Sequence, residues 1–199
     1  MKPRSVVIGG VSRQGIEKRL AAAGVELNDY ARMLLAHQVF DSVSPAEQAN
    51  FASFRVQDLG IQQPATLKTI FDLAMSQGLA LCPASAGPFL RLATMDQQNS
   101  TNSILSAGKK PTNSLAIASL PLGTDDFPKG FYLRVVDGVP WLRGYRCEDA
   151  YEFAPEDAFF PDTRAWVIWA WCWLQIFSRG PATGRIIHCA QARETPAMV

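Results

Sequence analysis

Apolar residues in the first half of this chain recur mostly at the spacing of helices. A helix is predicted over residues 12–23, where Ser12 can cap its start and Gly24 follows its end. A second helix is predicted to begin at Asn28. The clearest helical pattern runs from Thr66 to Gln77, with Gly78 as its stop.

Two shorter patterns lie between these predicted helices. Residues 5–8 are predicted to form a short strand that ends at Gly9-Gly10. The run Ser44-Pro45-Ala46-Glu47 has the form of a capping box with proline at the first helical position. It predicts a short helix, because residues 51–59 then alternate between apolar and polar.

Beyond residue 92 the spacing of apolar residues changes from about 3.6 residues, typical of a helix, toward 2, typical of a strand. Residues 96–114 form a polar tract that predicts a long exposed loop, and strands are predicted over 115–122, over 131–146 and from Ala165 onward. Helices followed by strands predict an α+β fold, with N-terminal helices packed on a C-terminal antiparallel sheet. We expect one domain over residues 1–177 and a flexible C-terminal tail over 178–199.

The strand region 131–146 contains a hairpin signal. Asp137-Gly138 stands between two alternating runs, as in a two-residue type I′ turn. This register places Phe131, Leu133, Val135, Pro140 and Leu142 on the core face of the hairpin. Pro140 lacks a donor, which places its strand toward a sheet edge. The other face carries Tyr132, Arg134, Trp141, Arg143 and Tyr145, and it is predicted to be the more exposed one.

The aromatic and arginine side chains of this face permit two interpretations. Such a surface can stack bases and contact phosphates, which would suit single-stranded nucleic acid. Alternatively, the side chains form cation–π pairs within the hairpin, and the acidic segment 148–162 covers the arginines. We favour the second interpretation.

A proline-rich stretch over residues 79–92 predicts a buried segment that ends in a short turn. It brings a thiol, Cys82, and a guanidinium, Arg91, toward one loop. An activated thiol or an arginine clamp would make this stretch a candidate enzyme site. Packing of Cys82, and an ion pair between Arg91 and an acid of segment 148–162, are the interpretations we favour.

Composition narrows the range of functions only slightly. The chain of 199 residues is 48% hydrophobic and 19% charged, with a net charge of +1, which neither favours nor excludes nucleic acid. Its four cysteines lack metal-ligand spacing, and neither a cofactor motif nor a catalytic cluster is found, so we assign no catalytic, cofactor or metal residues. Free thiols in a reducing cytoplasm are expected.

The tryptophan-rich stretch 165–177 is the most apolar part of the chain. It has 13 residues, fewer than the ~20 that a membrane-spanning helix needs. We therefore expect a buried strand or core helix here, with contact to a membrane surface or a partner as the alternative.

Several motifs together resemble a family of small bacterial proteins of uncharacterised function. They are Tyr30-Ala-Arg-Met-Leu-Leu-Ala-His, Val56-Gln-Asp-Leu-Gly, Ile70-Phe-Asp-Leu-Ala and the Leu-Cys-Pro…Gly-Pro…Leu-Arg-Leu run of residues 81–92. The resemblance covers about residues 25–97, and the loop 98–113 and the tail after 177 depart from it. Some relatives carry a helicase label, but this chain has no Walker motif. The family implies no catalytic residues.

These observations predict a non-catalytic binding protein of bacterial type that acts through a protein partner. Two alternatives stay open. One is an accessory protein that binds nucleic acid through Tyr132, Arg134, Trp141 and Arg143. The other is an enzyme that uses Cys82 and Arg91.

Overall fold

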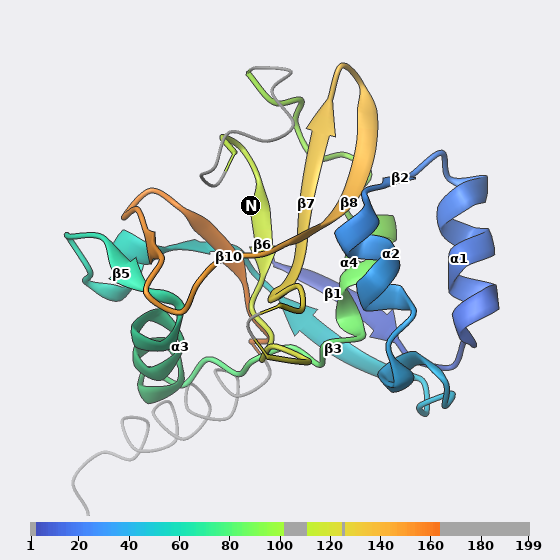
Figure 1. Cartoon of the computed structure of the whole chain (residues 1–199), viewed down its shortest axis with the longest axis horizontal. Coiled ribbons are helices and arrows are strands. Elements are labelled where there is room, and N and C mark those ends of the chain that lie inside the picture. Colours follow the sequence, from blue (N-terminus) through green and yellow to red (C-terminus); the bar gives the residue numbers. More distant parts are fainter. Residues whose placement is uncertain (1–2, 102–110, 125, 164–199) are drawn as a thin grey trace, which may run out of the picture.

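A central mixed sheet, with helices on both faces, organises the part of the chain that the structure describes (Figure 1). The structure is a computed structural model and describes residues 3–101, 111–124 and 126–163. Its helices are α1 (Arg13–Ala22), α2 (Asp29–Leu35), α3 (Leu67–Ser76) and α4 (Ala86–Ala93), with the 3-10 helices η1 (Gln38–Phe40) and η2 (Val56–Leu59). Its strands are β1 (Arg4–Ile8), β2 (Glu26–Leu27), β3 (Glu47–Phe51), β4 (Phe54–Arg55), β5 (Ala65–Thr66), β6 (Leu115–Ile117), β7 (Gly130–Val136), β8 (Val139–Tyr145), β9 (Glu152–Phe153) and β10 (Ala158–Phe160).

The sheet has the strand order β2-β8-β7-β6-β10-β4. This arrangement confirms the predicted α+β class; the predicted antiparallel pairing is present among β6, β7 and β8, and the sheet as a whole is mixed. Strands β6, β7 and β8 are antiparallel neighbours, whereas β10 is parallel to β6 and β2 is parallel to β8. The chain leaves β8 and crosses past both β7 and β6 before it forms β10, and such a crossover, unlike a hairpin, can join parallel strands.

Two apolar clusters lie on opposite faces of this sheet. The larger one packs α2 and α4 against β7 and β8, and α1 against α4, and it includes Phe131, Leu133 and Leu142 of the sheet. The smaller one packs α3 and η2 against the other face, around Tyr132 and Phe159. Figure 1 shows α1, α2 and α4 on one side of the sheet and α3 on the other. The predicted packing of the N-terminal helices on the C-terminal strands is therefore confirmed.

The helix starts follow the predicted capping residues. The side chain of Ser12 accepts a hydrogen bond from Gly15 N, that of Asn28 from Ala31 N, and that of Thr66 from Thr69 N. Each satisfies one of the amide groups that the first turn of a helix leaves without an intrahelical partner.

The helix predicted at Ser44-Pro45-Ala46-Glu47 is absent from the described fold, because strand β3 begins at Glu47. Strand β3 pairs with β1 in antiparallel register, with Ile8 opposite Glu47. The backbone amide of Gly10 donates to the carbonyl of Ser44 at 2.7 Å, which joins the two chain segments just before this pairing. Long-range pairing with the N-terminus therefore overrides the local capping signal.

The hairpin of β7 and β8 has the predicted register. Arg134 is opposite Trp141, and Val136 is opposite Val139. The turn residues Asp137 and Gly138 have φ angles of 50° and 79°, as a type I′ turn requires.

Several sequence-based predictions fall outside the described residues. They are the central part of the polar loop, residues 102–110, the strand predicted from Ala165 and the tail 178–199. The strand predicted over 115–122 is shorter than expected, since β6 ends at Ile117. No helix of the described part is long and apolar enough to cross a membrane.

Candidate functional site

The aromatic and arginine face of the hairpin is largely buried. Tyr132, Arg134 and Arg143 retain 7%, 0% and 8% of their exposure, while Trp141 and Tyr145 are half-buried. This face is therefore not an open surface, although Trp141 and Tyr145 leave it more exposed than the core face. This face is largely buried because other segments pack on both faces of the sheet. The alternation of residues within one hairpin does not show that its second face is also packed.

Within this face the side chains bind one another. Arg143 donates from Nε to Tyr132 Oη at 2.7 Å, and its guanidinium carbon lies 5.0 Å from the ring centroid of Trp141. Arg134 donates from Nε to Ser100 Oγ at 2.8 Å, so the segment after α4 covers it. The contact of Arg143 with Trp141 is a cation–π pair within strand β8, whereas the partner of Arg134, Ser100, lies outside the hairpin.

One acid of segment 148–162, Asp149, makes a different contact from the one we expected. Asp149 accepts a hydrogen bond from Lys129 Nζ at 2.8 Å, rather than covering the hairpin arginines. Nearby, Tyr145 Oη is buried and has no hydrogen-bond partner within the described structure. Burial raises the pKa of the Tyr145 hydroxyl.

Cys82 is a packed core residue. Only 5% of it is exposed, and its thiol donates to the carbonyl oxygen of Phe160 at 3.0 Å. Cys147 is half-buried, and burial raises the pKa of its thiol. A raised thiol pKa opposes formation of the thiolate, which is the reactive species.

Arg91 lies in helix α4 and not in a loop. The helix tolerates Pro88 because this residue stands in its first turn, where a missing amide hydrogen costs little. Gly87 lets the helix approach β7, since a Cβ atom there would lie 2.6 Å from the ring of Phe131. As a result Arg91 points into the protein and is fully buried.

The guanidinium of Arg91 binds backbone carbonyls and an amide side chain. Nη1 donates to Gln97 Oε1 at 2.9 Å and to the carbonyls of Arg134 and Trp141 at 3.2 and 3.4 Å. Nη2 donates to the carbonyl of Thr94 at 2.5 Å. The predicted ion pair with an acid of segment 148–162 is wrong, because the carbonyls of β7, β8 and Thr94 and the side chain of Gln97 supply the acceptors.

Burial lowers the pKa of Arg91 to about 10, although the negative charge of Asp96 acts in the opposite direction. Arg91 is still a cation at neutral pH. It joins α4 to both strands of the hairpin, which is a structural role. The structure does not bring Arg91 and Cys82 together, since they bind different strands.

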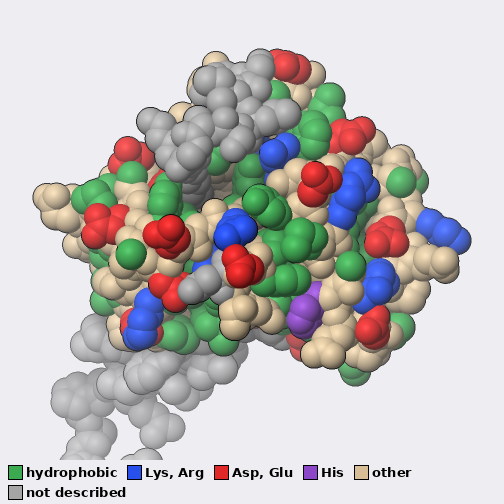
Figure 2. Space-filling model, viewed as in Figure 1, with side chains coloured by type: hydrophobic (Ala, Val, Ile, Leu, Met, Phe, Trp, Pro, Cys, Tyr) green, Lys and Arg blue, Asp and Glu red, His purple; other side chains and the backbone are tan. Residues whose placement is uncertain are grey.

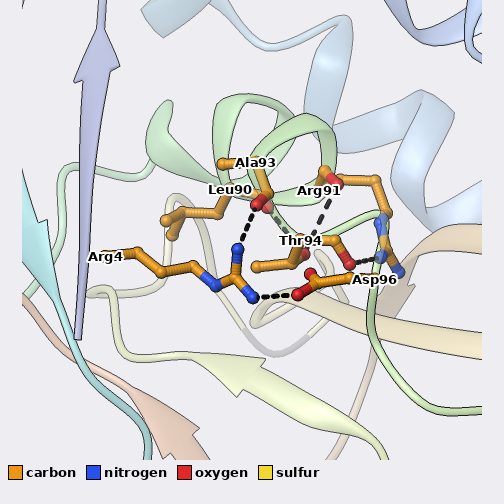
Figure 3. A network of polar contacts seen from close by, with 6 residues as sticks. All are labelled: Arg4, Leu90, Arg91, Ala93, Thr94 and Asp96. Atoms are coloured by element: carbon orange, nitrogen blue, oxygen red, sulfur yellow. Dashed lines mark hydrogen bonds and ion pairs between the residues drawn. The ribbon is translucent and has the colours of Figure 1, made fainter. Parts of the chain in front are cut away.

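The C-terminal end of α4 leads directly to a groove. Thr94 Oγ1 donates to the carbonyl of Leu90 at 2.7 Å, and Arg4 donates to the carbonyl of Ala93 at 3.0 Å and pairs with Asp96 (Figure 3). These bonds satisfy carbonyls that the helix end leaves without partners. They also hold Arg4 and Asp96 at the wall of the groove.

The groove has a volume of about 1070 Å³ and opens where β6 and β10 begin. These strands pair in parallel from Leu115 and Ala158 onward, and the segments that lead into them both line the groove. The groove is lined by Arg4, Ser53, Phe54, Arg55, Asp96, Gln97, Gln98, Pro111, Thr112, Asn113, Ser114, Leu115, Tyr151, Glu152, Ala154, Glu156, Asp157 and Ala158. Its size is that of a site for a ligand or a peptide.

The two walls of the groove differ in chemistry. Residues 96–98 and 111–114 contribute mainly amide and hydroxyl side chains, while segment 151–158 contributes Glu152, Glu156 and Asp157. Figure 2 shows acidic side chains on the left of the view, over the segments that flank β5 and β10. The wall formed by segment 151–158 is called the acidic wall below.

The sequence shows the two segments that line the groove, but it does not show that they lie close together in the fold. The polar tract 96–114 and the acidic segment 148–162 were each recognisable from composition. Their proximity depends on the parallel pairing of β6 with β10, which has no local sequence signal.

Neither metal-ligating residues nor comparisons with known proteins assign a function to the groove. Within the described residues, no three His, Cys, Asp or Glu side chains are grouped so that they could hold a metal ion. The chain matches no protein-family model, no curated protein and no solved structure.

Proposed function

We propose that this chain is a non-catalytic binding protein of the bacterial cytoplasm that acts through a protein partner at the groove. The observation that carries the proposal is the groove itself, about 1070 Å³ in volume and lined by charged, amide and apolar side chains. Such mixed lining suits the backbone and side chains of a polypeptide, which needs hydrogen bonds as well as apolar contacts. The bacterial origin rests on the family resemblance of residues 25–97.

The burial of the candidate reactive groups supports binding over catalysis. Cys82 and Arg91 are both inside the core, and their polar atoms bind backbone carbonyls of β10, β7 and β8. A catalytic nucleophile or an anion clamp must instead reach a substrate. The enzyme alternative therefore has less support than the binding proposal.

Nucleic acid is the second candidate, and it has one favourable observation. The half-buried ring of Trp141 carries the guanidinium of Arg143 on its face, which resembles the stacking partners that bases use. The burial of Arg134 and Arg143 weighs against it, because phosphate contacts need accessible cations. A protein partner at the groove has the better support.

Photo-cross-linking tests the proposal. A photoreactive amino acid replaces Gln98 on one wall or Glu156 on the other, and Gln14 on α1 serves as an exposed control outside the groove. After irradiation in the cells that produce the chain, we expect the same protein adduct from both groove positions and not from Gln14. Adducts that form equally at Gln14, or that disappear with nuclease, would contradict the proposal.

A further inference from the structure

Among the described residues that line the groove, acidic side chains outnumber basic ones. Two basic side chains, Arg4 and Arg55, face four acidic ones, Asp96, Glu152, Glu156 and Asp157. Arg4 pairs with Asp96, so this charge pair is already neutralised within the chain. Arg55 then stands against the three acids of the acidic wall.

Two of these acids are directed to solvent at the groove. Glu152 and Glu156 are exposed and stand four residues apart, the first in β9 and the second between β9 and β10. The third, Asp157, already accepts a hydrogen bond from the backbone amide of Ala154 at 2.9 Å. Glu152 and Glu156 are therefore the acids best placed to meet a ligand.

The opposite wall and the floor provide the other contacts that a polypeptide needs. Gln98 and Asn113 are exposed amide side chains, which can both donate to and accept from a peptide backbone. Phe54, Leu115 and Ala158 provide apolar surface at the sheet end of the groove. A cationic side chain of the ligand would thus meet the acidic wall while its backbone meets the amides.

We infer that the groove binds an extended segment of a partner protein that carries lysine or arginine side chains. This inference rests on the proposed function and names the chemistry of the partner. Complementary charge favours a basic segment, since like charges across an interface cost affinity. The same acidic wall disfavours nucleic acid, which would bring phosphates next to Glu152 and Glu156.

Three pools of synthetic peptides of equal length serve as probes. Their two central positions are Lys or Arg in the first pool, Glu or Asp in the second, and Gln or Ser in the third. Binding is measured by fluorescence anisotropy, and the position of the peptide is mapped from backbone amide shifts of the 15N-labelled protein. We expect the Lys/Arg pool to bind most tightly and to shift the amides of Leu115 and Ala158.

A double variant, Glu152→Gln with Glu156→Gln, tests the role of the acidic wall. It should weaken the Lys/Arg pool about three- to tenfold, as expected for the loss of two exposed ion pairs. The control, Glu17→Gln with Glu26→Gln, makes the same charge change on α1 and on β2, at the sheet edge opposite β4. It should leave binding unchanged.

Three results would overturn the inference. They are equal binding of the Glu/Asp or Gln/Ser pool, an equal loss in the control variant, and no binding of any pool. If the cross-links from Gln98 and Glu156 still form in any of these cases, the proposed function stands and the partner is not basic. If those cross-links are also absent, the proposed function fails as well.

Discussion

Replacing Asn28 by alanine should destabilise the protein more than the loss of an ordinary helix cap. The side chain of Asn28 caps α2 by accepting from Ala31 N at 3.0 Å. It also accepts from Gly144 N at 2.8 Å and donates to the Gly144 carbonyl at 3.0 Å. The side chain of Asn28 therefore caps a helix and also forms the two hydrogen bonds to Gly144 that the backbone of a neighbouring strand would otherwise form.

The expected magnitude follows from these bonds. Loss of the cap costs about 1 kcal/mol. The buried Gly144 then keeps an amide and a carbonyl without partners, at about 1–3 kcal/mol each. Water does not reach them easily, because α2 packs so closely that a Cβ atom on Gly144 would lie 2.6 Å from the Tyr30 carbonyl carbon. With partial relaxation we expect a total loss of roughly 2–4 kcal/mol.

Ser12→Ala is the matched control, because Ser12 caps α1 with a single exposed hydrogen bond from Gly15 N. It should cost only about 0.5–1 kcal/mol. Urea titration followed by tryptophan fluorescence gives the free energy of unfolding of both variants. Equal losses for Asn28→Ala and Ser12→Ala would refute the reasoning, because the bonds to Gly144 would then contribute nothing measurable.

Three further predictions concern the hairpin and the end of α4. Gly138→Val should destabilise by about 1–2 kcal/mol in urea titration, because Gly138 has a φ of 79° and a β-branched residue resists it, and an unchanged midpoint would contradict this. Arg91→Lys keeps the charge, but an ammonium cannot reproduce the planar set of donors on the guanidinium. The variant should therefore lose about 2–3 kcal/mol of unfolding free energy and have a lower thermal midpoint. A midpoint equal to that of the wild type would contradict a structural role. The hydrogen bond from Arg4 holds the pKa of Asp96 below its ordinary 3.8, so this stabilisation is present above that pH and disappears as the pH falls through the lowered pKa. Unfolding titrations across this acidic range should therefore show a steeper loss in the wild type than in Asp96→Asn, and parallel curves would contradict the linkage.

Features encoded by neighbouring residues were predictable from the sequence. The turn at Asp137-Gly138 set the hairpin register, since only a few residues tolerate positive φ at both turn positions. The starts of α1 and α2 followed from Ser12 and Asn28 for a similar reason, because short polar side chains satisfy the first amides of a helix.

Features that depend on distant contacts were not predictable. Glu47 opens β3 and not a helix because it pairs with Ile8, a residue 39 positions earlier. Arg91 is buried because the carbonyls of β7 and β8 accept its hydrogen bonds, and a sequence does not show where those carbonyls lie. An arginine in a sequence is ordinarily expected at the surface.

The burial of the arginines changes which surface of the molecule is available for binding. An aromatic and arginine face that was exposed would attract polyanions, but here Arg143 binds Tyr132 and Arg134 binds Ser100. On the described lining of the groove, outside the Arg4–Asp96 pair, the exposed acids Glu152 and Glu156 outnumber the exposed Arg55. The chain has a net charge of +1, but several of its cations, among them Arg91, Arg134 and Arg143, are buried. They do not contribute to the charge that a partner meets at the groove. The charge that a partner meets is set by which side chains remain exposed, and this favours a basic polypeptide over nucleic acid.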